Sequence, residues 1–227
     1  MSERTFKGPE EDEPRAMTQD RLHGYFRSTA AWRVRIAMNL KGIGAAQISH
    51  HLRRGDQSAP DYLRLNPQGL VPAFETAGTV LTQSLAIIEY FEETNPAPPL
   101  LPQDPVGRAH VRAFALAIAC DIHPVQNLRV LRRLRRLGQT EEQVQAWARE
   151  TIEPGLEACA ALIAGEPGPF CFGPAPTVAD ICLVPQLGNA RRFGTNMDFG
   201  RLLAVEAACN ALLAFQDAAP ERQADAE

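Results

Sequence analysis

The sequence lacks any long apolar run and any strong excess of one charge. No apolar run approaches the roughly 20 residues that span a bilayer, and the first 16 residues, MSERTFKGPEEDEPRA, have no apolar core of the kind that signal peptides carry. The formal net charge of -4 gives no reason to expect nucleic acid or an anionic membrane as a partner. These absences predict a cytoplasmic protein that binds neither.

Cysteine and lysine are also scarce. The cysteines are few, scattered through the second half of the chain, and form neither a CxxC pair nor a zinc-like spacing. We interpret them as small buried hydrophobic residues: Cys120, Cys159, Cys171, Cys182 and Cys209. His50 and His51 form a polar strand end in this interpretation, so no metal is expected. The chain has two lysines and 21 arginines. Arginine is preferred throughout the chain, so the number of arginines carries no information about function and only the positions of individual arginines do.

What is present is the composition of a globular protein with two differently organised parts. Of 227 residues, 45% are apolar and 22% are charged, which is ordinary for a soluble chain. Residues 1–16, rich in Glu, Asp and Pro, are predicted to be a disordered extension. Residues 17–96 alternate strand and helix patterns in the order βαβαββα. The strands are expected at 21–26, 46–52, 70–75 and 79–83, and the helices at 30–41, 59–67 and 84–95.

Turn and cap residues separate these elements. Gly42 stands where a helix C-terminal glycine is favoured, the segment TAGT at 76–79 is typical of a hairpin, and Ser84 is a good N-cap. On the helix at 30–41, Arg35 and Asn39 are expected to face away from the apolar side. That apolar side consists of Val34, Ile36, Ala37, Met38 and Leu40.

A proline-rich segment ends this first part. NPAPPLLPQDP has five prolines in eleven residues, so it can continue neither a helix nor a central strand, and residues 97–106 are predicted to be a linker. The pattern from 107 to 227 is helical almost throughout, with helices expected at 106–122, 125–137, 141–163, 178–193 and 201–218. Thr177 and Asp180 have the spacing of a capping box and are assigned to folding.

The stretch YFRSTAAW places a cation and two hydroxyls at the start of a helix. Unpaired N–H groups and the positive end of the helix dipole favour an anion there. A hydroxyl from Ser28 or Thr29, with Arg27 beside it, would stabilise a thiolate and lower the pKa of the thiol. The alternative is that one of the hydroxyls only caps the helix.

Two further segments point to other parts of one ligand. If Val71–Pro72 in GLVPAF is cis, the backbone of Val71 is free to pair with an extended peptide, although an ordinary edge proline is the alternative. Gln83 and Ser84 in LTQSLAI begin a helix, which favours a carboxylate, although simple capping is the alternative. A ligand that is at once a thiol, a peptide and a carboxylate is glutathione.

These residues also carry a resemblance to a known family. YFRSTAAWRVRIAMNLKG, NPQGLVPAF, LTQSLAIIEYFEETNP, LLPQDP and TVADICLVPQ resemble the zeta class of glutathione transferases, and within it the maleylacetoacetate and maleylpyruvate isomerases. The likeness covers about nine-tenths of the chain, from Leu22 to its end. It implies a thioredoxin-like α/β N-terminal domain, an all-α helical C-terminal domain and a homodimer.

The resemblance assigns roles to residues at matching positions. Ser28 matches the serine that activates the thiolate, Thr29 stands where a second serine is usual, and Ala30 stands where many members have cysteine. No protein thiol can therefore assist at that point. The residues that match glutathione contacts are Val71, Pro72, Gln83, Ser84, Gln126 and Asn127.

The arginines indicate the class of substrate. Arg27, Arg129 and Arg192 match arginines around the substrate in bacterial isomerases, and arginine binds carboxylates through a planar, permanently charged fork. His123 is expected to point to the same place as these arginines, and helix capping and substrate contact are the two alternatives for it. The other arginines of the same helix are interpreted as a solvated face: Arg132, Arg133, Arg135 and Arg136.

The resemblance thus implies a glutathione-dependent cis–trans isomerase of a maleyl keto-acid, active in aromatic catabolism and needing no metal. The thiolate would add to the cis double bond, the resulting single bond would rotate, and elimination would give the fumaryl isomer. Two alternatives stay open from the residues. One is a transferase that conjugates or dehalogenates small α-halo acids and consumes glutathione, and the other is a non-catalytic interaction module of the same fold.

Overall fold

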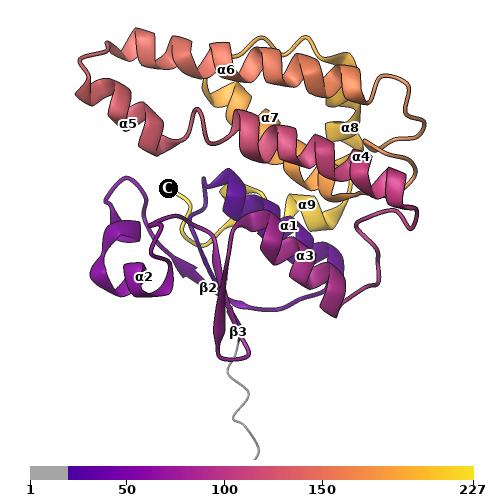
Figure 1. The fold of residues 1–227 in the computed structure, drawn as a ribbon, viewed down its shortest axis with the longest axis horizontal. Helices are drawn as coiled ribbons and strands as arrows, with labels where there is room; N and C mark the ends of the chain where they lie inside the picture. The colour runs from indigo at the N-terminus through magenta and orange to yellow at the C-terminus, as the bar shows by residue number, and fades with distance from the viewer. Residues whose placement is uncertain (1–19) are drawn as a thin grey trace, which may run out of the picture.

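The computed structural model describes residues 20–227, and the predicted extension at 1–16 lies outside them. A four-stranded sheet is built from β1 (Arg21–Gly24), β2 (Ala46–Ser49), β3 (Ala73–Thr76) and β4 (Thr79–Thr82) in the order β2-β1-β3-β4 (Figure 1). β1 and β2 are parallel, and the other two pairings are antiparallel. With α1 (Thr29–Lys41), α2 (Pro60–Leu65) and α3 (Ser84–Thr94), these strands give the predicted order βαβαββα.

Local sequence signals explain most of these boundaries. The N-cap of α1 is Ser28, whose Oγ accepts a hydrogen bond from the Ala31 N–H at 3.2 Å. The helix ends at Gly42, which has the left-handed φ of 65° that glycine adopts at low cost. In the β3–β4 turn, Ala77 and Gly78 have φ values of 46° and 77°, the two positive values that a tight hairpin of the predicted kind needs.

The helix α3 begins at the expected residue, but its N-cap differs by one residue from the expectation. Ser84 is the first helical residue, and the N-cap is Gln83, which has a φ of 69° and gives the helix no side-chain hydrogen bond. The first turn of α3 contains no acidic residue either. The unpaired N–H groups at this helix start are therefore not satisfied by a capping side chain.

The second part is helical. Its elements are α4 (Pro105–Leu116), the π-helical turn η2 (Ala117–Ile122), α5 (Leu128–Arg136), α6 (Glu141–Leu162), α7 (Val178–Arg192), α8 (Gly200–Asn210), α9 (Leu213–Gln216) and the short η3 (Pro220–Arg222). The helix expected at 106–122 thus ends as a π turn, and the one expected at 201–218 is interrupted at 211–212. A short η1 (Asp56–Ser58) precedes α2.

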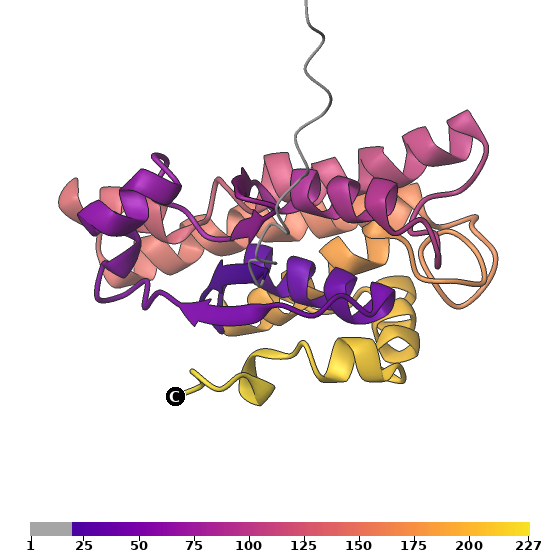
Figure 2. The same cartoon turned by 90° about the horizontal axis from the view of Figure 1, so that it is seen from below.

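α1 lies between the two parts and contacts both. It packs against α3 on one side and α7 on another, and α9 covers a third side, where the C-terminal segment runs beneath the first part in Figure 2. One apolar core extends through both parts, from Leu22 and Val34 to Leu187 and Phe215.

The covering C-terminal segment corrects one expectation. Arg35 is buried rather than facing solvent, and its guanidinium donates to the carbonyl oxygens of Phe26 and Ala218, both at 3.0 Å. Asn39 is exposed, as expected, and donates to the Ala214 carbonyl at 3.0 Å.

α7 is the most buried helix of the second part, and its start has the predicted capping geometry. The Asp180 carboxylate accepts from the Thr177 N–H at 2.8 Å and from the Thr177 hydroxyl at 2.9 Å. It also accepts from the Cys171 N–H at 2.8 Å, so the carboxylate joins the preceding loop to the helix. Among residues 20–227, no helix is long and apolar enough to cross a membrane.

Candidate active site

Sheet register brings most of the predicted glutathione residues to one end of the sheet. His23 at the end of β1 pairs with Ala73 at the start of β3, and Ala73 pairs with Thr82 at the end of β4. The segments that follow β1, precede β3 and follow β4 therefore meet at the same end of the sheet. These segments carry the predicted residues Ser28, Val71, Pro72, Gln83 and Ser84. The Val71–Pro72 peptide bond is cis.

Ser28 caps α1 and keeps a donor for a ligand. Its Oγ accepts from the Ala31 N–H, so the hydroxyl hydrogen is free to point to another acceptor. Thr29 follows it and is buried, and its hydroxyl has no hydrogen-bond partner within residues 20–227. The capping alternative and the thiolate hypothesis for Ser28 are thus compatible, because one oxygen can serve both.

Gln68 connects residues that the sequence predicted separately, and sequence reasoning missed it. Its side-chain oxygen accepts from Gln83 Nε2 at 2.9 Å, and its backbone carbonyl accepts from Arg129 Nη2 at 2.6 Å. The first of these bonds fixes the Gln83 amide, and the second joins α5 to the loop before β3. The only local signal was a turn-forming NPQG segment, which gives no indication of a partner 61 residues away.

Gln126 and Asn127 stand just before α5, the helix that the Arg129–Gln68 bond joins to this region. Asn127 is the N-cap of α5, and its Oδ1 accepts from the N–H groups of Arg129 and Val130 at 3.0 and 3.2 Å. Gln126 is buried, and its Nε2 has no partner in the described part of the chain. A buried amide donor without a partner is unfavourable, so it is available for a ligand acceptor.

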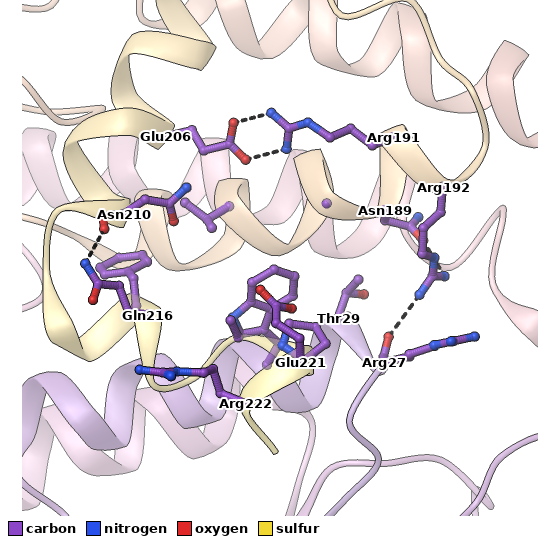
Figure 3. Close-up of a pocket in the computed structure, with 16 residues that line it drawn as sticks. Arg27, Thr29, Asn189, Arg191, Arg192, Glu206, Asn210, Gln216, Glu221 and Arg222 are labelled. Atoms are coloured by element: carbon purple, nitrogen blue, oxygen red, sulfur yellow. Dashed lines mark hydrogen bonds and ion pairs between the residues drawn. The ribbon is translucent and has the colours of Figure 1, made fainter. Parts of the chain in front are cut away.

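Arg27 and Arg192 stand together at the start of α1. Arg192 Nη1 donates to the Arg27 carbonyl at 3.4 Å and its Nη2 to Asn189 Oδ1 at 2.8 Å, while the Arg27 guanidinium lies 5.0 Å from the centre of the Phe26 ring. Both arginines line a cavity of about 610 Å³ between α1, α7, α8 and the C-terminal segment (Figure 3). At the other end of this cavity, Glu206 forms a bidentate ion pair with Arg191.

The predicted residues do not all share this cavity. Thr29 lines it together with Arg27 and Arg192. The glutathione residues, Arg129 and His123 are not part of its lining. Most of the glutathione set lies at the end of the sheet, and Gln126 and Asn127 stand just before α5. The structure thus brings two of the three predicted substrate arginines together and attaches the third to Gln68.

His123 follows the π turn and is only partly exposed. Burial, with smaller contributions from the nearby charges of Arg33 and Arg192, lowers the pKa of its imidazole to about 3. His123 is therefore neutral near pH 7 and can donate through one ring nitrogen and accept through the other. Burial is also the main cause that lowers the pKa of Arg192, with Arg27 next.

Arg33 is a second residue that sequence reasoning missed. It lies on the second turn of α1, its side chain is buried, and its Nη1 is 3.5 Å from Ser84 Oγ at the start of α3. Burial lowers the pKa of its guanidinium, which nevertheless stays charged at neutral pH. Within residues 20–227, no group of His, Cys, Asp and Glu is arranged to hold a metal ion.

Comparison with known proteins identifies the family. The family model described as glutathione S-transferase, N-terminal domain, matches residues 22–99, and the corresponding C-terminal model matches residues 126–215. The chain belongs to the glutathione S-transferase family. The thioredoxin-like and all-helical architecture expected from the sequence is thereby confirmed.

Relatives of known name and structure place the chain more narrowly. The maleylacetoacetate isomerase of Pseudomonas aeruginosa is 46% identical over 209 residues, 90% of this chain and 98% of that protein. The holo structure of a maleylpyruvate isomerase, described as a bacterial zeta-class glutathione S-transferase, matches with a TM-score of 0.89 and 44% identity over 91% of this chain and 100% of that one. A maleylacetoacetate isomerase from Methylobacterium extorquens AM1 with bound malonate and glutathione has a TM-score of 0.88 and 40% identity over 91% and 99%. The resemblance to the zeta class is confirmed.

Proposed function

We propose that the protein is a glutathione-dependent cis–trans isomerase that converts a maleyl keto-acid, maleylacetoacetate or maleylpyruvate, to its fumaryl isomer. The observation that carries the proposal is the start of α1, where the Ser28 hydroxyl retains a free hydrogen and Arg27 and Arg192 stand beside it. This arrangement can hold a thiolate next to a dianionic substrate. The relatives named as isomerases support the same reaction.

The residues at this end of the sheet and just before α5 fit glutathione as a cofactor. Gln126 has a buried donor without a partner in residues 20–227, and α3 begins without a capping side chain. We assign glutathione binding to Ser28, Val71, Pro72, Gln83 and Ser84 at the end of the sheet and to Gln126 and Asn127 from the helical part. When bound, glutathione supplies a thiol nucleophile that can add reversibly to a conjugated double bond.

The protein's own groups then perform three tasks. Ser28 and the N-terminus of α1 donate toward the sulfur and favour its thiolate form. Arg27 and Arg192 bind the carboxylate or keto oxygens of the substrate and stabilise negative charge that develops there. Arg129, whose guanidinium donates to the Gln68 carbonyl, is assigned to the same substrate. Neutral His123 can donate a hydrogen bond to the substrate without adding a charge. Thr29 forms the wall of the cavity beside Ser28.

Ultraviolet absorbance of maleylpyruvate and maleylacetoacetate tests the proposal. Turnover of either compound should require catalytic glutathione, which should be recovered intact, and the faster reaction identifies the preferred substrate. Ser28→Ala should lower kcat about 10²- to 10³-fold, as loss of one catalytic donor does elsewhere. Glutathione consumed in proportion to an α-halo acid, without isomerisation of either maleyl acid, would instead establish the transferase.

The remaining assignments follow from the same proposal. We propose that residues 17–96 form the glutathione-binding domain, 97–106 the linker and 107–227 the substrate-binding domain. The protein is proposed to be a cytoplasmic homodimer. The large exposed apolar side chains of Val106 and Leu116 on α4 support a partner on that helix, and light scattering after gel filtration tests the dimer.

A further inference from the structure

Arg33 is a buried cation for which the site described above has no use. Its side chain is 1% exposed. Within residues 20–227, no carboxylate forms an ion pair with it, and its Nε and Nη2 donate to no group. A buried charge without a counter-ion is strongly unfavourable unless something else compensates it. Arg33 lies beside Ser84 at the start of α3, and this position indicates which group compensates its charge.

The contact that Arg33 does make fixes the direction of a hydroxyl. A guanidinium donates but cannot accept, so in the 3.5 Å contact the Ser84 oxygen is the acceptor. The Ser84 hydroxyl hydrogen is then free to donate to another group. Since Gln83 gives α3 no side-chain cap, this hydroxyl lies beside unpaired N–H groups at the positive end of the helix dipole.

We propose that Arg33 is a positioning residue for the α-carboxylate of the γ-glutamyl group of glutathione. It orients the Ser84 hydroxyl to donate to this carboxylate and places a buried positive charge behind the start of α3. The carboxylate supplies the negative charge that Arg33 lacks within the described chain. The inference rests on the proposed dependence on glutathione, and Arg33 acts through Ser84 without touching the ligand.

Calorimetric titration with two ligands tests this role directly. One ligand is glutathione, and the other is γ-aminobutyryl-cysteinyl-glycine, which lacks only the α-carboxylate in question. Arg33→Met removes the charge but keeps an apolar side chain in the same space. It should weaken glutathione binding about 10- to 100-fold and change the Kd of the analogue less than about twofold. Ser84→Ala should show the same pattern, and the double variant should weaken glutathione binding by less than the product of the two single effects, because part of the Arg33 effect passes through Ser84.

Arg35→Met is the matched control. Arg35 is on the same helix and also buried, but its guanidinium is paired with two carbonyl oxygens. Its loss should lower the Tm of the ligand-free protein and leave the Kd of glutathione unchanged. Arg33→Met should leave that Tm unchanged or raise it, because the charge it removes is unpaired.

Two results would overturn the proposal. One is a Tm loss in Arg33→Met equal to that in Arg35→Met with an unchanged Kd of glutathione, and the other is equal weakening of both ligands. If Arg33→Met does not fold, Arg33→Gln is used instead, because glutamine is neutral and keeps a hydrogen-bond donor. In that variant, a ratio of the Kd of glutathione to the Kd of the analogue that equals the wild-type ratio would also overturn the proposal. If the wild-type protein does not isomerise maleyl acids, only the proposed function is refuted. The role of Arg33 is tested separately, because its experiments measure ligand binding and the melting temperature and not turnover.

Discussion

Replacing Lys41 by methionine should destabilise the protein strongly. Lys41 ends α1, its side chain is 0% exposed, and its ammonium uses all three donors. They go to Glu92 Oε2 at 2.7 Å, the Asn95 carbonyl at 2.6 Å and the Pro98 carbonyl at 2.9 Å. One amine thus joins the end of α1 to the end of α3 and to the proline-rich segment.

The magnitude follows from what the substitution leaves behind. Removing one member of a buried ion pair costs about 3–5 kcal/mol, because the other charge stays buried. The Glu92 side chain is 11% exposed and still accepts from the Leu100 N–H at 3.0 Å, which favours the lower end. We therefore expect Lys41→Met to lower the free energy of unfolding by about 3 kcal/mol.

Urea unfolding followed by far-ultraviolet circular dichroism at pH 7 measures this loss. Lys41→Met/Glu92→Gln should be more stable than Lys41→Met alone, because the unpaired charge is gone and the amide still accepts from Leu100. Glu93→Gln, an exposed neighbour, is the control and should change stability by less than about 0.5 kcal/mol. A loss below about 1 kcal/mol in Lys41→Met, or a double variant less stable than the single one, would refute the reasoning.

Three further predictions use the same unfolding assay. Asp180→Ala leaves three donors without an acceptor, the N–H groups of Cys171 and Thr177 and the Thr177 hydroxyl. An unsatisfied buried donor costs about 1–3 kcal/mol, so the variant should lose about 3–5 kcal/mol, and a loss under about 1 kcal/mol would contradict it. Gly155→Ala places a Cβ in steric conflict with Ile122 Cγ1 and should cost about 1–3 kcal/mol despite the better helix propensity of alanine. A gain in stability would show that Ile122 moves freely. Because the pKa of His123 falls from 6.5 to about 3 on folding, the free energy of unfolding decreases as the pH drops below 6.5. His123→Gln should reduce that loss by up to about 1.4 kcal/mol per pH unit between pH 7 and 4. Equal slopes of unfolding free energy against pH in the variant and the wild-type protein would exclude His123 as the cause.

The order of elements could be predicted because its signals are local. Alternating and helical periods gave the order βαβαββα and the helices after it, and the left-handed Gly42 was predicted where the structure has it. The mistakes concern where elements end or are interrupted, such as the π turn at Ala117–Ile122 and the N-cap of α3, which is Gln83 and not Ser84. Helix ends depend on tertiary packing as well as on propensity, so they are predicted less well than the helices themselves.

Residues whose surroundings come from distant segments could not be predicted. The polar face of α1 holds Arg35, which the distant C-terminal segment covers and pairs through the Ala218 carbonyl. Arg33 has no sequence feature that distinguishes it from a surface arginine. Gln68 acquires its position from contacts with Gln83 and Arg129. Periodicity describes one helix at a time, and these contacts join segments far apart in the chain.

The shared apolar core has a consequence for recombining this protein with its relatives. The proline-rich segment looks like a natural crossover point, but Leu22 and Val34 on one side of it belong to the same core as Leu187 and Phe215 on the other. A chimera joined there would have to match two halves of one interior that were selected separately. Hybrids should therefore inherit function more often when α1, α7 and the C-terminal segment come from the same parent.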